Sequence, residues 1–119
     1  MDHSISKHSE VNPEFENVRD VSPEAVKNHI QEVDLIDVRR PDEYDGELGH
    51  IANAKLIVLD TLPERFQEIP KDKPVVLICR SGRRSAQAST FLQEQGYDNT
   101  YNMQGGMLLW NEKGFPTEK

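Results

Sequence analysis

The chain has 119 residues, of which 35% are hydrophobic and 29% charged, and its formal net charge is −7. These values suit one small globular domain and argue against non-specific binding to nucleic acid or to an anionic membrane surface. No apolar run approaches the roughly 20 residues that span a bilayer, and the N-terminus does not read as a secretory signal. The single cysteine can form neither an internal disulfide nor a CxxC metal pair, so we expect a reducing, cytoplasmic setting and no metal ion or cofactor.

The first half of the chain begins with a polar, aperiodic stretch. Residues 1–14 predict a flexible or loosely packed extension, with His3 and His8 as surface residues. A short strand is expected within residues 15–21. Ser22 and Pro23 then have the residue types of a helix cap and a first helical position. Further strands are expected over residues 35–38 and 54–59, with a short helix or turn from residue 41 to residue 44 between them.

The second half of the chain continues this alternation. Leu62, Phe66 and Ile69 fall at helical spacing, and residues 75–78 are a short apolar run that predicts a buried strand. A helix follows and is expected to stop near Gly96, after which residues 99–103 predict a strand. Gly105 and Gly106 precede a last helix that contains Trp110 and ends near Gly114.

Strands that alternate with helices predict an α/β fold: one domain over residues 15–119, with a mainly parallel central sheet flanked by helices on both faces. In such sheets, functional sites lie beyond the carboxyl ends of the strands. Cys79 stands at that end of one predicted strand, and residues 37–40 stand at the equivalent end of another.

The segment after the 75–78 strand carries the strongest chemical signal. It consists of Cys79, Arg80, Ser81, Gly82, Arg83, Arg84 and Ser85. A free thiol ordinarily titrates near pH ~8.5, and a helix N-terminus or cationic neighbours lower this to roughly 3.5–7.5. Backbone N–H groups of such a loop can also converge on an anion. We therefore expect a substantially ionised, nucleophilic Cys79 in an anion-binding cradle.

Two plainer interpretations of this segment stay open. Cys79 ends an apolar run and is compatible with a buried core residue, and the arginines are compatible with a solvated basic turn. A protease-like partnership with a distant histidine is also open. Tyrosine phosphatases place five residues between the cysteine and the arginine of their loop, whereas only four separate Cys79 from Arg84, which disfavours a tetrahedral phosphate.

Taken together, the motifs resemble a single-domain rhodanese, a thiosulfate sulfurtransferase-like domain. The resemblance covers residues 21–116. Its pieces are the opening residues 21–24, the strand end Leu35-Ile36-Asp37-Val38-Arg39, the Gly49-His50-Ile51 segment with Ala54, the cysteine loop, and Gly105-Gly106 with Trp110, Gly114 and Pro116. Asn53, Gln104 and Met107 depart from the residues that are common in this family.

The resemblance implies that Cys79 takes a sulfane sulfur from thiosulfate or another persulfide donor and passes it on as a persulfide. The acceptor would be cyanide, a thiol or a protein thiol. It implies that Arg80, Ser81, Gly82, Arg83 and Arg84 bind the anionic donor or shape the loop, with Arg80 at the pocket mouth and Arg83 facing solvent. Asp37, Arg39 and Ser85 would support the loop, Glu43 could join the Asp37–Arg39 pair, and His50 and Trp110 would be structural.

Three other functions compete with the enzyme. The same loop would serve a sulfur-relay module that hands sulfur to a protein partner. A cysteine phosphatase or arsenate reductase is disfavoured by the loop length. A non-catalytic interaction domain is disfavoured because the cysteine and the loop arginines are all present.

Overall fold

The computed structural model describes residues 4–119, which contain a six-stranded sheet. The strands lie in the order β1 (Ser9–Val11), β2 (Arg19–Val21), β6 (Thr100–Met103), β5 (Val75–Ile78), β3 (Asp34–Asp37) and β4 (Lys55–Leu56). All neighbouring pairs are parallel except β1 and β2. The carboxyl ends of β5, β3 and β6 therefore meet at one edge of the sheet, as the alternation of elements predicts.

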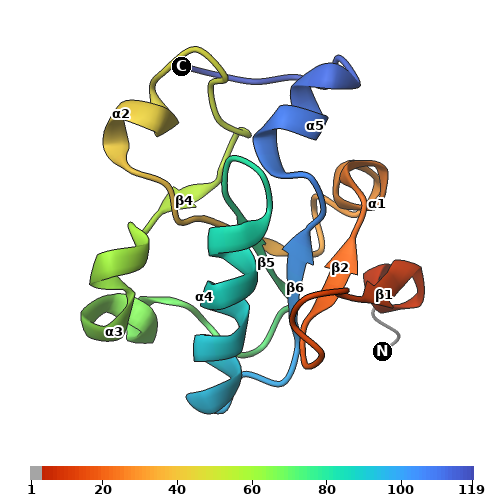
Figure 1. Cartoon of the computed structure of the whole chain (residues 1–119), viewed down its shortest axis with the longest axis vertical. Helices are drawn as coiled ribbons and strands as arrows, with labels where there is room; N and C mark the ends of the chain where they lie inside the picture. The colour runs from red at the N-terminus through yellow and green to blue at the C-terminus, as the bar shows by residue number, and fades with distance from the viewer. Residues whose placement is uncertain (1–3) are drawn as a thin grey trace.

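The helices cover both faces of this sheet (Figure 1). They are α1 (Pro23–Asn28), α2 (Pro41–Tyr44), α3 (Leu62–Arg65), α4 (Arg83–Glu94) and α5 (Gly106–Glu112), with 3-10 turns η1 (Ser4–His8), η2 (Leu59–Thr61) and η3 (Phe66–Glu68). Ser22 caps α1 as predicted, because its side chain accepts a hydrogen bond from the Ala25 N–H at 3.1 Å. Gly96 follows α4 with φ +93°.

Strand β5 divides the core into two apolar clusters. Val76 and Ile78 face the cluster that contains residues of α1 and α5, and Val75 and Leu77 face the one that contains residues of α3 and α4. Every residue of β5 is buried. A strand that is buried on both faces reads as a continuous apolar run, which explains why residues 75–78 show no alternation.

The N-terminal segment is more closely packed than the flexible or loosely packed extension that the sequence predicts. Strand β1 pairs with β2, and Ile5 is 1% exposed within the core cluster of α1 and α5. The described part of the extension is thus packed against the domain, whereas His3 lies outside the described residues. His8 is exposed, as expected.

Two central elements are shorter than expected. The strand predicted over residues 54–59 is paired only at Lys55–Leu56, and the 62–69 helix divides into α3 and the 3-10 turn η3. Asn53, which departs from the common glycine, has φ +71°, a backbone angle that asparagine tolerates.

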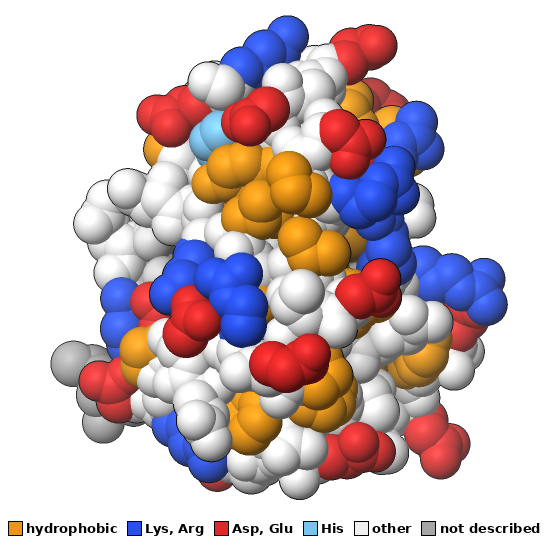
Figure 2. Space-filling view, turned by 90° about the vertical axis from the view of Figure 1, so that its left-hand side faces the viewer, with side chains coloured by type: hydrophobic (Ala, Val, Ile, Leu, Met, Phe, Trp, Pro, Cys, Tyr) orange, Lys and Arg blue, Asp and Glu red, His pale blue; other side chains and the backbone are white. Residues whose placement is uncertain are grey.

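The surface of the domain mixes charges of both signs. Figure 2 shows the face that carries α2 and α3, where acidic and basic side chains lie interspersed around apolar patches. Within residues 4–119, no helix combines the length and apolarity required to cross a membrane. The same residues contain no cluster of three or more His, Cys, Asp or Glu side chains arranged to hold a metal ion.

Candidate active site

The cysteine loop lies at the carboxyl end of β5, where the chain passes into α4. Cys79 follows the last residue of the strand and is 1% exposed. Gly82 precedes the helix with φ +103°, a left-handed conformation that favours glycine. Helix α4 begins at Arg83, so the last two residues of the cysteine segment before Ser85 are already helical.

Two hydrogen-bond donors converge on the Cys79 sulfur. The Gly82 N–H lies 3.0 Å from Sγ, and the Ser85 hydroxyl lies 3.2 Å from it. Sγ also lies at the N-terminal end of the 12-residue helix α4, where backbone N–H groups have no partners within the helix. Hydrogen-bond donors and a helix N-terminus are the features that accompany nucleophilic cysteines in proteins.

Helix α5 supports the loop from the outside. The Met107 N–H donates to the Cys79 carbonyl at 2.9 Å, and the Leu108 N–H donates to the Arg80 carbonyl at 3.0 Å. Gly106 has φ +57°, and a Cβ atom there would overlap both of these carbonyl oxygens. Glycine at this position therefore permits the contact that holds the loop against α5.

Arg84 ties the end of the loop to α2. Its guanidinium donates to both oxygens of Glu43, at 2.7 and 2.8 Å. These bonds lower the Glu43 pKa to about 2, and the Arg40 N–H acts in the same direction. The pKa of Arg84 is raised, first by its hydrogen bonds to Glu43. Of the two roles that the sequence suggests for Arg84, the geometry shows that of holding the loop.

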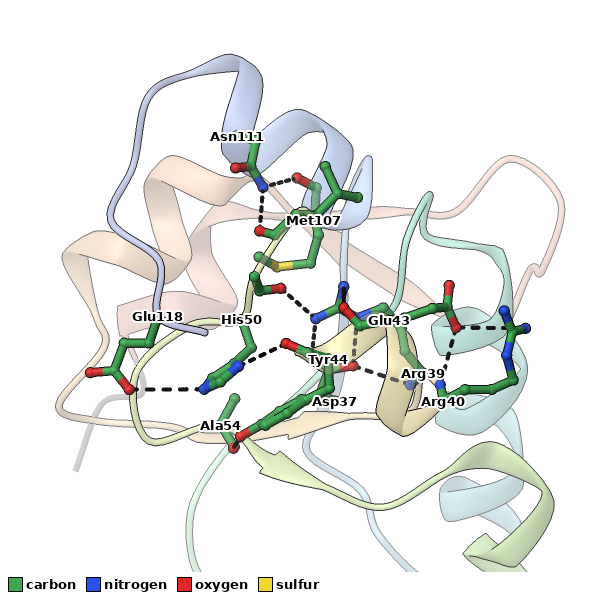
Figure 3. Close-up of polar contacts among 12 residues, drawn as sticks. Asp37, Arg39, Arg40, Glu43, Tyr44, His50, Ala54, Met107, Asn111 and Glu118 are labelled. Atoms are coloured by element: carbon green, nitrogen blue, oxygen red, sulfur yellow. Dashed lines mark hydrogen bonds and ion pairs between the residues drawn. The ribbon is translucent and has the colours of Figure 1, made fainter. Parts of the chain in front are cut away.

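Asp37 and Arg39 form a buried ion pair beside the loop (Figure 3). The guanidinium donates to both Asp37 oxygens at 2.9 and 2.8 Å, to the Gly49 carbonyl at 2.8 Å and to the Glu43 carbonyl at 3.1 Å. This ion pair therefore contacts the backbone of two neighbouring segments, at Glu43 and at Gly49. Glu43 joins it only through its backbone, because its carboxylate pairs with Arg84.

The other side chains predicted to be structural are also placed as expected. His50 Nδ1 lies 2.9 Å from the Tyr44 carbonyl, and its ring stacks on the Tyr44 ring (Figure 3). Trp110 is 1% exposed, and its indole N–H donates to the Pro116 carbonyl at 2.9 Å. Both residues therefore stabilise the fold around the site.

The remaining loop residues face outward. Arg80 is exposed and lines a pocket of about 290 Å³ together with Leu48, Leu108 and acidic residues of α2 and the segment after it. Arg83 is 69% exposed and lies 3.6 Å from Glu14. Ser81 is exposed on the other side of the loop, in a pocket of about 330 Å³ that includes residues 12–15.

Sequence reasoning missed three partners of this site. Asn102 on β6 accepts a hydrogen bond from the Ser85 hydroxyl, and Asp20 on β2 accepts one from the Asn102 amide at 2.9 Å. Asn12 also donates to Asp20 at 2.9 Å. A polar residue inside the strand predicted over residues 99–103 was the available signal for Asn102.

The fold and site together define an α/β domain whose single cysteine lies in a loop between β5 and α4. Residues 22–113 match the family described as Rhodanese-like domain. The chain is 37% identical over 102 residues to a protein named Sulfurtransferase from Allochromatium vinosum, an alignment that covers 83% of this chain and 94% of that one. The chain belongs to the rhodanese-like family.

Solved structures agree with this assignment. A rhodanese-related protein from Thermoplasma volcanium superposes with a TM-score of 0.76 at 33% identity, over 82% of this chain and 94% of that one. A Rhodanese-like domain protein from Staphylococcus aureus gives a TM-score of 0.72 at 32% identity, over 84% and 98% of the two chains.

Proposed function

We propose that this chain is a sulfurtransferase that carries a sulfane sulfur as a persulfide on Cys79. The observation that carries the proposal is the environment of Sγ, which accepts hydrogen bonds from the Gly82 N–H at 3.0 Å and from the Ser85 hydroxyl at 3.2 Å. A thiolate held in this way at the end of a strand and the start of a helix is a prepared nucleophile. The relative named Sulfurtransferase supports the same reading.

The reaction has two half-reactions that balance without an external oxidant or reductant. The Cys79 thiolate attacks the outer sulfur of thiosulfate, a new Sγ–S bond forms, and the sulfur–sulfur bond of thiosulfate breaks with its electron pair leaving on sulfite. A thiophile such as cyanide then attacks the outer sulfur of the persulfide. The Sγ–S bond breaks, its electron pair returns to Cys79 as the thiolate, and thiocyanate leaves. Thiosulfate and cyanide serve here as the simplest donor and acceptor.

Arg80 is the loop arginine best placed to attract the anionic donor. It is exposed and lines the 290 Å³ pocket, and no carboxylate of residues 4–119 forms an ion pair with it. Arg84 is already paired with Glu43. Because the arginine at the end of the loop is engaged in this way, the arrangement favours sulfur transfer over a phosphatase or arsenate reductase, which would need that guanidinium for its oxyanion.

A protein acceptor is the second candidate, and a specific observation favours it. Leu108 is 39% exposed at the rim of the Arg80 pocket, where an apolar side chain would suit a protein surface more than a small anion. Slow turnover with small thiophiles but fast transfer to a protein thiol would favour this relay role. A nucleophilic thiol also suits a reducing compartment such as the cytoplasm.

Intact mass after incubation with thiosulfate tests the proposal. We expect one added sulfur on the wild type, its removal by cyanide, and no adduct on Cys79→Ser, which lacks every thiol because Cys79 is the only cysteine. Wild type unfolded in urea is the matched control, since it keeps the thiol and loses the loop. No adduct with thiosulfate or another sulfane donor, or equal labelling of the unfolded chain, would contradict the proposal.

A further inference from the structure

A chain of buried polar side chains leads from the catalytic sulfur to strand β2. The Ser85 hydroxyl contacts both Cys79 Sγ, at 3.2 Å, and Asn102 Oδ1. The Asn102 amide nitrogen donates to Asp20 Oδ1 at 2.9 Å. Ser85 and Asn102 are 0% and 2% exposed, and Asp20 is 7% exposed, so the chain is shielded from solvent.

Asp20 fixes which group donates and which accepts in this series of hydrogen bonds. A carboxylate only accepts hydrogen bonds, so the Asn102 amide nitrogen faces Asp20 and the amide oxygen faces Ser85. The Asn12 side chain also donates to Asp20, at 2.9 Å, and holds the carboxylate in place. Asn102 is therefore an acceptor toward Ser85.

Ser85 has one hydroxyl hydrogen and two acceptors that compete for it. When Cys79 is a thiolate, the charged sulfur attracts the hydrogen, and the Ser85 oxygen then faces Asn102 Oδ1 without a hydrogen between them. When Sγ carries no charge, as a thiol or as the inner sulfur of a persulfide, the hydrogen points to Asn102 and every partner is satisfied.

We propose that Asn102, held by Asp20, is a positioning residue that competes with Cys79 Sγ for the Ser85 hydrogen and so favours the uncharged states of this sulfur. The thiolate is then less stabilised than it would be with Ser85 and no competing acceptor. Its attack on a sulfane sulfur therefore releases more free energy than it would without Asn102. In the persulfide the negative charge has moved to the outer sulfur, and the Ser85 hydrogen returns to Asn102. This gain on sulfur transfer rests on the persulfide chemistry proposed above.

Other charged groups lie on the elements packed around this sulfur, and all are left unchanged by the test. They come from the loop and α4, from the end of β3, from α2 and from β2: Arg80, Arg83, Arg84, Asp37, Arg39, Glu43 and Asp20. Because these groups stay in place, the test changes only Ser85 and Asn102.

The test is the pH profile of Cys79 alkylation by iodoacetamide, which needs no sulfur transfer. Ser85→Ala removes a donor to the thiolate, so its midpoint should rise by about 1 pH unit. Asn102→Leu removes the competing acceptor, so its midpoint should fall by about 0.5 pH unit. In the Ser85→Ala background, Asn102→Leu should have no further effect, since Asn102 acts through the Ser85 hydrogen.

Ser89→Ala is the matched control. Ser89 is a buried serine on the same helix, one turn beyond Ser85. Its hydroxyl lies 2.9 Å from the Thr100 hydroxyl on β6, the strand that also carries Asn102. Its profile should match the wild type. Asn102→Ala removes the same amide oxygen with a smaller side chain and must shift the midpoint downward too, with circular dichroism and thermal unfolding showing that each variant folds.

Opposite shifts for Ser85→Ala and Asn102→Leu would support the proposal, because loss of packing alone would not produce them. Shifts in the same direction, an unchanged midpoint in both Asn102 variants, or an Asn102→Leu effect that persists without Ser85 would each overturn it. If thiosulfate adds no sulfur to the wild type, the proposed function fails, while the alkylation profiles still decide the role of Asn102.

Discussion

Replacing Asp37 with asparagine should remove a large part of the stability of this domain. The Arg39 guanidinium is buried, and both Asp37 oxygens lie within 2.9 Å of it. Asp37→Asn leaves this cation without its counter-charge, and breaking a buried ion pair in this way costs about 3–5 kcal/mol. A domain of this size has about 5–15 kcal/mol of stability, so the change removes about a fifth of it or more.

Urea unfolding followed by circular dichroism measures the effect. With a slope of about 1.5 kcal/mol per M, the midpoint should fall by about 2–3 M. Arg65→Ala is the control, because Arg65 contacts Glu68 through the same kind of two-point contact, at 2.9 and 3.0 Å, on the surface. Its midpoint should stay close to wild type, since water solvates both of these charges. Equal midpoint shifts in the two variants would refute the argument that burial decides the cost.

Two further predictions concern the supports of the loop. Gly106→Ala places a Cβ atom against the Cys79 and Arg80 carbonyls, so we expect a destabilised domain and slower persulfide formation in the mass assay; wild-type rates would contradict the proposed close approach. The Glu43 pKa is lowered from 4.5 to about 2 by Arg84, so the stability that this carboxylate contributes is complete above about pH 4.5 and is lost as the pH falls through about 2. The difference in unfolding free energy between wild type and Glu43→Gln should therefore be constant above pH 5 and shrink on acidification, and a difference that grows at low pH would reverse this sign.

Local patterns predicted the elements that depend on neighbouring residues. Ser22 and Pro23 start α1 as their residue types indicate, and the apolar 75–78 run is the buried strand β5. Sequence predicts these two features because a helix cap and a buried strand each depend on only a few neighbouring residues. The alternation of such elements was enough to predict the parallel sheet and the end of it that carries the cysteine.

The N-terminal segment shows where local patterns stop being informative. Ile5 is an isolated apolar residue in a polar stretch, and β1 has only three residues, so neither has a periodicity that sequence reasoning can detect. Strand β1 is placed by its pairing with β2, and Ile5 is placed by packing into a core cluster whose other residues come from later in the sequence. Tertiary contacts of this kind override the weak local propensity.

The charge of the cysteine loop also depends on residues that are distant in sequence. In sequence, three arginines close to Cys79 and no nearby acid suggest one strongly positive cradle. In the fold, Glu43 from α2 pairs with Arg84, and Glu14 from the N-terminal segment lies beside Arg83. The acids that balance the loop come from far along the chain, and only the topology brings them there.

The groups in direct contact with the Cys79 sulfur are therefore not the loop arginines. Among residues 4–119, the groups within hydrogen-bond distance of Sγ are a backbone N–H and a hydroxyl, at 3.0 and 3.2 Å. Their hydrogens have fixed or two-state directions, whereas an exposed guanidinium is mobile and screened by salt. In our proposal Arg80 raises the local concentration of an anionic donor at the pocket, while Gly82, Ser85 and Asn102 set how strongly negative charge on the sulfur is stabilised. We therefore expect the loop arginines to govern access and loop shape, and the buried polar side chains to govern the chemistry of Cys79.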